Sequence, residues 1–312
     1  MDASARVFVA GHRGMVGSAV SRALRAAGYT DILERSRAEL DLTDRGSVDA
    51  FLAAEKPDAV IDAAAKVGGI VANDIYSGDF IRENLLIQTN LIDAAYRHGV
   101  KKFVFLGSTC IYPKHCEQPM REDALLSGSL EPTNEAYAVA KIAGIVMCRS
   151  YAKQFGFNAV SLLPTNLYGP GDNFDLETSH VIPALMRKAH EAKVSGAKSM
   201  QVWGSGEPTR EFLHVDDLAD AIRFVLENVD ESDDDLLNVG SGQEITIGDL
   251  VRTICDVVGY DGLLDFDRSK PDGTPRKLSD PSKLAARGWR ASTSLRDGLA
   301  SVYDWFRQNH AG

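Results

Sequence analysis

The stretch RVFVAGHRGMVG, residues 6–17, decides the fold of this 312-residue chain. It opens with a short apolar run that predicts a buried strand, and the pattern from Ser18 to Ala27 predicts a helix. Between them, Gly11 permits a tight turn, Gly14 lets a backbone approach a pyrophosphate, and Gly17 allows close helix–sheet packing. A glycine turn that opens a helix N-terminus therefore predicts a dinucleotide-binding unit, with a plain strand–helix turn as the alternative.

The rest of the first half repeats the alternation of strand and helix. Helical patterns lie near residues 80–98 and 135–155. Further apolar runs predict strands at residues 31–35, 59–65, 103–106 and 158–163. Apolar strands separated by helices indicate a parallel sheet covered on both faces, so we predict a doubly wound α/β fold, Rossmann-like in topology.

The pattern changes after the Gly-Pro-Gly sequence at residues 169–171. Strands become shorter and turn signals denser, with strands predicted at 200–203, 210–215 and 236–239 and a helix at 216–228. We expect residues 1–168 to form the dinucleotide-binding domain, with segments near 212–240 returning to it. Residues 169–312 are expected to form mainly a smaller, interleaved substrate-binding domain.

Composition excludes several classes of partner. The net charge of −10 argues against nucleic acid and against an anionic membrane surface. No apolar run approaches the roughly 18 residues that a membrane span needs. The four cysteines lack metal-binding spacing, so no metal is expected. The first residues do not resemble a secretory signal, so we expect a cytoplasmic protein with reduced thiols.

Tyr137 and Lys141 stand four residues apart in a predicted helix, which places both side chains on one face. An ammonium beside a phenol favours the phenolate and eases proton transfer. Ser108, at the end of a predicted strand, can hold a carbonyl oxygen. These three residues predict proton and hydride transfer at a C–O bond, against the alternative of a packed tyrosine and a solvated lysine.

The usual acidic residue is missing from the very end of the predicted second strand, where Glu34 is followed by Arg35-Ser36-Arg37. A carboxylate at the very end of that strand would repel a 2′-phosphate, whereas Arg37 pairs with one, and Arg13 in the glycine turn adds a second cation. The sequence therefore favours NADP(H) over NAD(H). The alternative, kept open by Glu34, is that these arginines are surface charges.

Six stretches together resemble the extended short-chain dehydrogenase/reductase family of nucleotide-sugar enzymes. They are residues 11–18, 107–114, 131–134, 164–170, 179–185 and 270–277. The resemblance spans nearly the whole chain. It implies 3,5-epimerisation and NADPH-dependent 4-reduction of GDP-4-keto-6-deoxy-D-mannose, carried out by a homodimer.

The same resemblance assigns roles to individual residues. Cys110 is the expected base and His180 the expected acid of the epimerisation, although from sequence alone a small buried cysteine and a surface or capping histidine are alternatives. The expected cofactor-binding residues are Gly11, His12, Arg13, Gly14, Met15, Val16, Gly17, Arg37, Leu106, Gly107, Lys141, Pro164, Asn166, Leu167 and His180.

Four residues are expected at the nucleotide end of the substrate. Lys188 and Arg210 would neutralise the pyrophosphate, while Trp203 would stack on guanine and Asp272 would accept hydrogen bonds. Their ordinary alternatives are a solvated charge, a core aromatic and loop ion pairs. Two competing functions also remain: a related NAD(P)-dependent nucleotide-sugar 4-reductase or epimerase of different stereochemistry, and a non-enzymatic NADPH-binding sensor.

Overall fold

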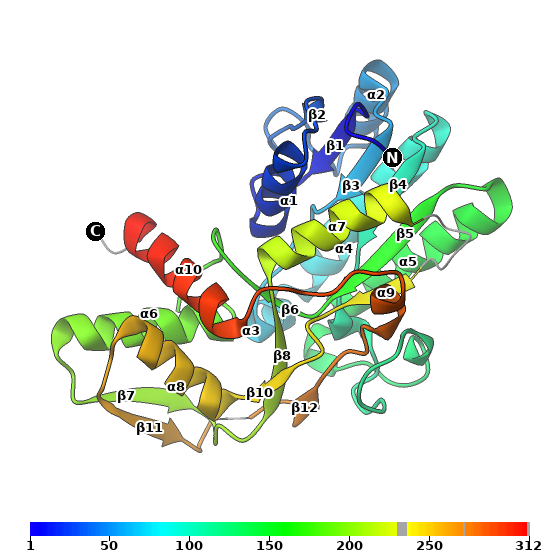
Figure 1. Ribbon diagram of the computed structural model, residues 1–312. Coiled ribbons are helices and arrows are strands. Elements are labelled where there is room, and N and C mark those ends of the chain that lie inside the picture. The colour runs from blue at the N-terminus through cyan, green and yellow to red at the C-terminus, as the bar shows by residue number, and fades with distance from the viewer. Residues whose placement is uncertain (177, 230–235, 271, 311–312) are drawn as a thin grey trace.

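A parallel sheet of six strands forms the centre of the larger lobe (Figure 1). The computed structural model describes residues 1–312 except 177, 230–235, 271 and 311–312. In spatial order the strands are β2 (Ile32–Leu33), β1 (Val7–Ala10), β3 (Ala59–Asp62), β4 (Lys102–Leu106), β5 (Ala159–Pro164) and β9 (Leu236–Val239). All neighbouring pairs are parallel, which confirms the predicted fold class.

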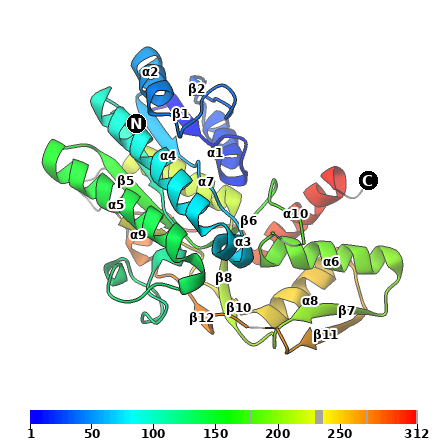
Figure 2. The same cartoon turned by 180° about the vertical axis from the view of Figure 1, so that it is seen from behind.

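Helices cover both faces of this sheet. On one face α1 (Met15–Ala26) packs beside α7 (Val215–Asn228), as Figure 1 shows. On the other, α4 (Ser77–Arg97) lies between α2 (Arg45–Glu55) and α5 (Glu135–Phe155), as seen from behind in Figure 2. Strands β1, β3, β4, β5 and β9 are buried along their full length. Burial on both faces explains why these strands have continuous apolar patterns instead of alternating ones.

The strand order places a ligand crevice at the end of β1. The chain leaves β1 for β2 on one side and then crosses to β3 on the other, so the connections diverge above β1 and β3. In open α/β sheets ligands bind at such a switch point, outside the carboxyl ends of the strands. The glycine turn that follows β1 lies at this position.

A smaller lobe sits at the carboxyl-terminal edge of the sheet (Figure 1). Its helices α6 (Val181–Ser195), α8 (Ile247–Val258) and α10 (Leu295–Asn309) enclose an apolar core of their own. Its strands are β6 (Asn166–Tyr168), β7 (Ser199–Trp203), β8 (Thr209–His214), β10 (Glu244–Thr246), β11 (Leu263–Asp267) and β12 (Arg276–Lys277). Strand β8 pairs with β6, β10 and β12, while β7 pairs with β11.

The remaining elements are short. They are the helices α3 (Ile70–Ile75) and α9 (Ser282–Ala286) and the 3-10 turns η1 (Thr109–Ile111), η2 (Glu122–Ala124) and η3 (Pro132–Asn134). No described helix combines the length and the apolarity that a membrane crossing requires.

Several element boundaries differ from the sequence predictions, most clearly those of the first helix and of the second and third strands. The first helix starts at Met15 and not at Ser18, because Gly14 already acts as its N-cap. The second strand shrinks to two residues, and the third ends at Asp62, where the chain turns into the loop above the sheet. Hydrophobic patterns locate strands well, but hydrogen bonding to neighbouring strands sets their ends.

Candidate active site

The glycine turn leaves no room for side chains. Gly11 has φ +79°, and a Cβ there would lie 2.7 Å from the carbonyl oxygen of Ala63. A Cβ on Gly17 would overlap the Gly11 carbonyl and come within 2.8 Å of the His12 Cα. The amide of Gly14 donates to Gly11 O (3.0 Å), so the turn delivers the N-terminus of α1 to the crevice. This packing matches a backbone that must approach a pyrophosphate closely.

Polar groups at the turn remain open to a ligand. His12 Nδ1 is buried and has no hydrogen-bond partner within the described part of the chain. Met15 and Val16 begin α1 and pack against the apolar core on that face. A buried polar atom without a partner is costly, so an incoming ligand that pairs with it is favoured. The turn therefore fits a dinucleotide.

The cations beyond β2 divide into paired and available ones. Arg35 donates to Glu55 Oε1 (2.7 Å), and Arg25 holds Glu34 Oε2 (2.8 Å). Arg37 makes a loose contact with Glu83 (3.6 Å) and its side chain is 73% exposed, while Arg13 is also exposed. Because Glu34 is engaged with Arg25, it does not oppose an anion near Arg37. This arrangement fits a 2′-phosphate at the rim of the turn.

Ser108 and Tyr137 meet above the end of β4. The hydroxyl of Ser108 accepts from the amide of Cys110 (3.2 Å) and shares a side-chain hydrogen bond with Tyr137. Burial raises the pKa of Tyr137, the negative charge of Cys110 adds to that rise, and the Ser108 hydrogen bond opposes it. The phenol is therefore a protonated donor pointing at a hydroxyl, a suitable arrangement for holding a carbonyl oxygen.

Lys141 lies one turn further along α5, deep in the protein. Its ammonium donates to the carbonyl oxygen of Leu106 (2.8 Å), and the residue is 3% exposed. Burial lowers its pKa, and the charge of Asp62 at the end of β3 works in the opposite direction. Asp62 is itself buried, with one carboxyl oxygen lacking a partner among the described residues. Desolvation raises the pKa of Asp62 to about 6.

One electrostatic expectation is corrected by this geometry. The spacing of Tyr137 and Lys141 suggested that the ammonium lowers the phenol pKa. In this structure the Tyr137 pKa is raised, because desolvation of the phenolate and the negative charge of Cys110 outweigh the hydrogen bond with Ser108. Lys141 instead faces the Leu106 carbonyl and Asp62. The tyrosine therefore starts as an acid.

Cys110 has a cationic neighbour that the sequence argument did not single out. Lys277 Nζ in β12 donates to Cys110 Sγ at 3.4 Å. Burial would raise the thiol pKa, but the charge and hydrogen bond of Lys277, the hydrogen bond from Ser108 and the charge of Arg210 lower it overall. The signal available in the sequence was the stretch at residues 270–277, quoted above without a role for this lysine. A depressed pKa favours the reactive thiolate.

His180 is the N-cap residue of α6. It is exposed, and desolvation by the surrounding protein lowers its pKa. The segment just before it contacts the loop above β3, where the amide of Gly69 donates to Thr178 O (3.3 Å). The histidine therefore follows a segment that touches the loop after β3, and its lowered pKa favours the neutral imidazole.

The remaining predicted cofactor residues lie along the ends of β4 to β6. Gly107 N donates to Leu162 O (2.8 Å), and Pro164 closes β5. Asn166 is held by the Glu211 carbonyl (2.8 Å), and Leu167 packs against the apolar core. These contacts fix the strand ends on which the crevice is built.

The predicted nucleotide end is assembled in the smaller lobe. Trp203, at the end of β7, is 58% exposed. The ammonium groups of Lys188 and Lys270 lie 4.9 and 5.4 Å from its ring centroid. Desolvation lowers the Lys188 pKa. An exposed indole with two cations near its ring is suited to a planar base carrying a phosphate chain.

Arg210 and Asp272 lie beside one another but have different environments. Arg210 donates to Thr209 O (2.7 Å), and burial lowers its pKa. Asp272 accepts from the amide (2.6 Å) and hydroxyl (2.8 Å) of Ser205, so both of its oxygens already tie one loop to another. Asp272 therefore shapes the loop, and its remaining lone pairs are all that it can offer to a ligand.

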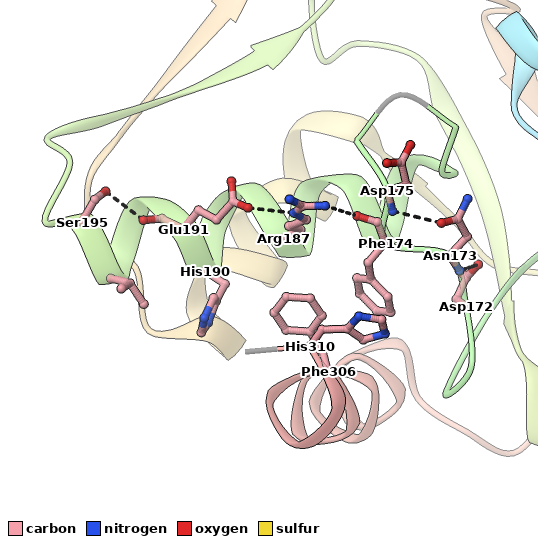
Figure 3. A pocket seen from close by; sticks show the side chains of 11 residues that line it. Asp172, Asn173, Phe174, Asp175, Arg187, His190, Glu191, Ser195, Phe306 and His310 are labelled. Carbon is pink, nitrogen blue, oxygen red and sulfur yellow. Dashed lines mark hydrogen bonds and ion pairs between the residues drawn. The ribbon is translucent and has the colours of Figure 1, made fainter. Parts of the chain in front are cut away.

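One cavity lies away from these residues. It has about 690 Å³ between α6 and α10 and is lined by Phe174, His190, Phe306 and His310 among others (Figure 3). None of the predicted catalytic, cofactor or substrate residues lines it. The predicted catalytic groups Ser108, Cys110 and Tyr137 instead lie together near the carboxyl end of β4.

Residues 7–240 match the model of the NAD dependent epimerase/dehydratase family. The chain belongs to this family. GDP-L-fucose synthase 1 of Arabidopsis thaliana is 59% identical to it over 99% of this chain and 95% of that protein. The GDP-L-fucose synthase of Escherichia coli K12 is 54% identical, with 97% of each chain covered.

A solved member of similar shape contains the cofactor. The GDP-mannoheptose C4 reductase of Campylobacter jejuni, with NADP bound, superposes with a TM-score of 0.92. The two sequences are 36% identical, and the match covers 98% of this chain and 99% of the Campylobacter jejuni enzyme. The family membership confirms the resemblance inferred from the six sequence stretches.

Proposed function

We propose that this chain converts GDP-4-keto-6-deoxy-D-mannose into GDP-L-fucose by 3,5-epimerisation followed by NADPH-dependent 4-reduction. The observation that carries the proposal is Cys110, held with a depressed pKa beside the hydrogen-bonded Ser108 and Tyr137. A simple reductase needs only the last two residues. A base beside them adds the capacity to remove a carbon-bound proton.

The relatives support this substrate and cofactor. Two that are more than half identical over almost the whole chain are named GDP-L-fucose synthases. The buried, unpartnered His12 Nδ1 and the loosely paired Arg37 support a dinucleotide with a 2′-phosphate. When bound there, NADPH supplies the hydride for the reduction.

In the reduction, the protein's task is to hold the ketone oxygen and give it a proton. Ser108 donates a hydrogen bond to that oxygen, and Tyr137 transfers the proton. The raised Tyr137 pKa keeps this proton in place until negative charge develops on the oxygen. Lys141, anchored on the Leu106 carbonyl, orients the site and balances that charge.

In the epimerisation, the same oxygen site stabilises an enolate. The thiolate of Cys110 removes the proton from a carbon next to the ketone, and the electron pair moves onto the oxygen. His180, reprotonated from solvent, returns a proton to the opposite face of that carbon. The two residues serve the two neighbouring carbons in turn.

The nucleotide end is assigned to the smaller lobe. Trp203 stacks on guanine, and Lys188 and Arg210 neutralise the pyrophosphate. Both cations are partly desolvated, which strengthens their attraction for an anion. Asp272 accepts two hydrogen bonds from Ser205 and so holds the loop that contains this serine.

We also propose that the protein is a cytoplasmic homodimer that pairs through α4 and α5. Val139 and Val146 are seven residues apart, on one face of α5, and are 41% and 42% exposed. Leu86 on the adjacent α4 is 37% exposed. The two helices lie side by side on the outside of the sheet (Figure 2). Exposed apolar residues along two packed helices suit a helix-bundle contact.

A related C4 reductase is the second candidate, favoured by the similarity to the Campylobacter jejuni enzyme. Pure protein incubated with the keto sugar and NADPH distinguishes the two. The main proposal expects NADPH oxidation and a GDP-L-fucose product identified by nuclear magnetic resonance. Reduction without inversion at the two neighbouring carbons identifies the reductase, and absence of turnover refutes both. Tyr137→Phe is the control for adventitious oxidation.

A further inference from the structure

Lys277 and Cys110 are 167 residues apart in the chain and meet at the crevice. The lysine is half-buried in β12, and its ammonium lies 3.4 Å from the sulfur. The roles assigned above to base, acid and oxygen-binding residues do not include it. A cation in hydrogen-bond contact with a thiol sulfur stabilises the thiolate.

The position of Lys277 is fixed by the backbone on both sides. Its strand pairs in parallel with β8, with Lys277 opposite Arg210. The next amide, Leu278 N, donates to Gln118 Oε1 (2.8 Å). Ser279 then donates through its amide (2.8 Å) and hydroxyl (2.7 Å) to the fully buried carboxylate of Glu211. These contacts fix the backbone from which the Lys277 side chain extends toward the Cys110 sulfur.

The other charged and titratable groups around Cys110 do not replace this contact. Arg210 on β8 acts on the thiol through its charge, but no hydrogen bond joins the two among the described residues. Tyr137 on α5 is protonated. Cys116, on the loop that follows, also feels Lys277, yet burial leaves its pKa raised. The two half-buried cysteines thus respond differently to the same lysine, and direct contact distinguishes them.

We propose that Lys277 is a positioning residue that holds Cys110 as a thiolate aimed at the substrate carbon. Its use in catalysis rests on the proposed function. When the thiolate takes the proton, a C–H bond breaks, an S–H bond forms and the electron pair reaches the ketone oxygen. After His180 protonates the opposite face, solvent takes the thiol proton and restores the histidine. The Lys277 ammonium keeps its protons throughout and lowers the cost of regenerating the thiolate.

The thiolate is tested without substrate or cofactor. Cys110 is alkylated with iodoacetamide over a range of pH, and the modified peptide is quantified by mass spectrometry. Trypsin cleavage after Lys102 and Lys114 separates Cys110 from Cys116. We expect Lys277→Met to move the midpoint of the alkylation profile upward by at least about one pH unit, a loss of about tenfold in rate near neutrality.

Two further variants make the result specific. Lys277→Arg keeps the charge and is expected to stay within about threefold of the parent rate. Lys101→Met removes a lysine at the far, amino-terminal end of β4, where it pairs with Asp58 (2.8 Å), and should leave the profile unchanged. An unchanged Lys277→Met profile in a protein that binds NADPH normally overturns the proposal. Loss of reactivity in Lys277→Arg as well as Lys277→Met assigns the effect to packing and also overturns it.

The catalytic arm follows solvent deuterium entering the keto sugar without NADPH. Lys277→Met should lose this exchange at least about tenfold while 4-reduction of the unepimerised sugar continues. A raised KM with normal exchange makes Lys277 a substrate-binding residue and refutes the proposal. If the parent protein exchanges nothing while its alkylation profile still depends on Lys277, the proposed function fails and the lysine–thiolate pair stands.

Discussion

Two aspartates at opposite ends of β3 should respond to pH with opposite sign. Asp62 is buried at the carboxyl end, and desolvation raises its pKa from 3.8 to about 6. The pKa of Asp62 is higher in the folded protein than in the unfolded chain, so the protonated carboxyl is the form that folding favours. This contribution to stability is complete below the pKa of the unfolded chain and is lost as pH rises through about 6. The displacement corresponds to about 3 kcal/mol in the free energy of unfolding, at ~1.4 kcal/mol per pH unit.

Asp62→Asn removes this titration and preserves the shape of the side chain. From about pH 4.5 to about pH 7.5, the free energy of unfolding of the variant should therefore rise by about 2 kcal/mol relative to that of the parent protein. This is the part of the full effect of about 3 kcal/mol that falls within this pH range. Asp58→Asn, just before β3, is the matched contrast. Hydrogen bonds from Lys101 and from the Arg6 amide lower the Asp58 pKa against a small desolvation cost. Its contribution is present above the unfolded pKa and is lost as pH falls.

The assay is urea unfolding of the parent protein and both variants at several pH values, monitored by tryptophan fluorescence and circular dichroism. Differences between a variant and the parent cancel the titration of all other carboxylates. The Asp62→Asn difference should rise with pH while the Asp58→Asn difference falls. A flat Asp62→Asn difference, or two differences of the same sign, refutes the assignment of a destabilising buried carboxylate at the end of β3.

Four further predictions concern the glycine turn, the cofactor, the base and the proposed dimer contact. Gly17→Ala should weaken NADPH binding at least about tenfold, because its Cβ overlaps the Gly11 carbonyl, whereas Gly46→Ala, with nothing closer than 3.9 Å, should be neutral or stabilising in a fluorescence titration. Arg37→Ala should raise the Kd for NADPH about tenfold and leave that for NADH nearly unchanged. Cys110→Ser should abolish deuterium exchange into the keto sugar but retain some direct 4-reduction; unaltered exchange contradicts a thiolate base. Val146→Glu should shift the protein from dimer to monomer in sedimentation experiments, since it buries a charge in the proposed contact.

The fold was largely predictable because its decisive signals are local. A strand, a glycine turn and a helix follow one another within residues 6–27, and sterics alone require glycine at 11 and 17. Helix α5 was predicted with both ends correct. The spacing of Tyr137 and Lys141 on it needs only the helical repeat.

The site was less predictable because its electrostatics depend on residues distant in sequence. The sequence argument gave Lys141 the task of lowering the Tyr137 pKa, but burial dominates and raises it. Asp62 had no recognised role, since its influence on Lys141 requires β3 and α5 to be brought together. Desolvation is a property of the packed structure and has no local sequence pattern.

The sequence by itself determined the doubly wound sheet and the dinucleotide turn, and it predicted which groups move protons, because these inferences depend on residue type and short spacing. Only the tertiary structure decided which of those groups is charged. The parallel pairing of β12 with β8 carries Lys277 to Cys110 across 167 residues of chain. That contact, together with the Ser108 hydrogen bond and the charge of Arg210, lowers the Cys110 pKa, since a nearby ammonium offsets the cost of burying a thiolate.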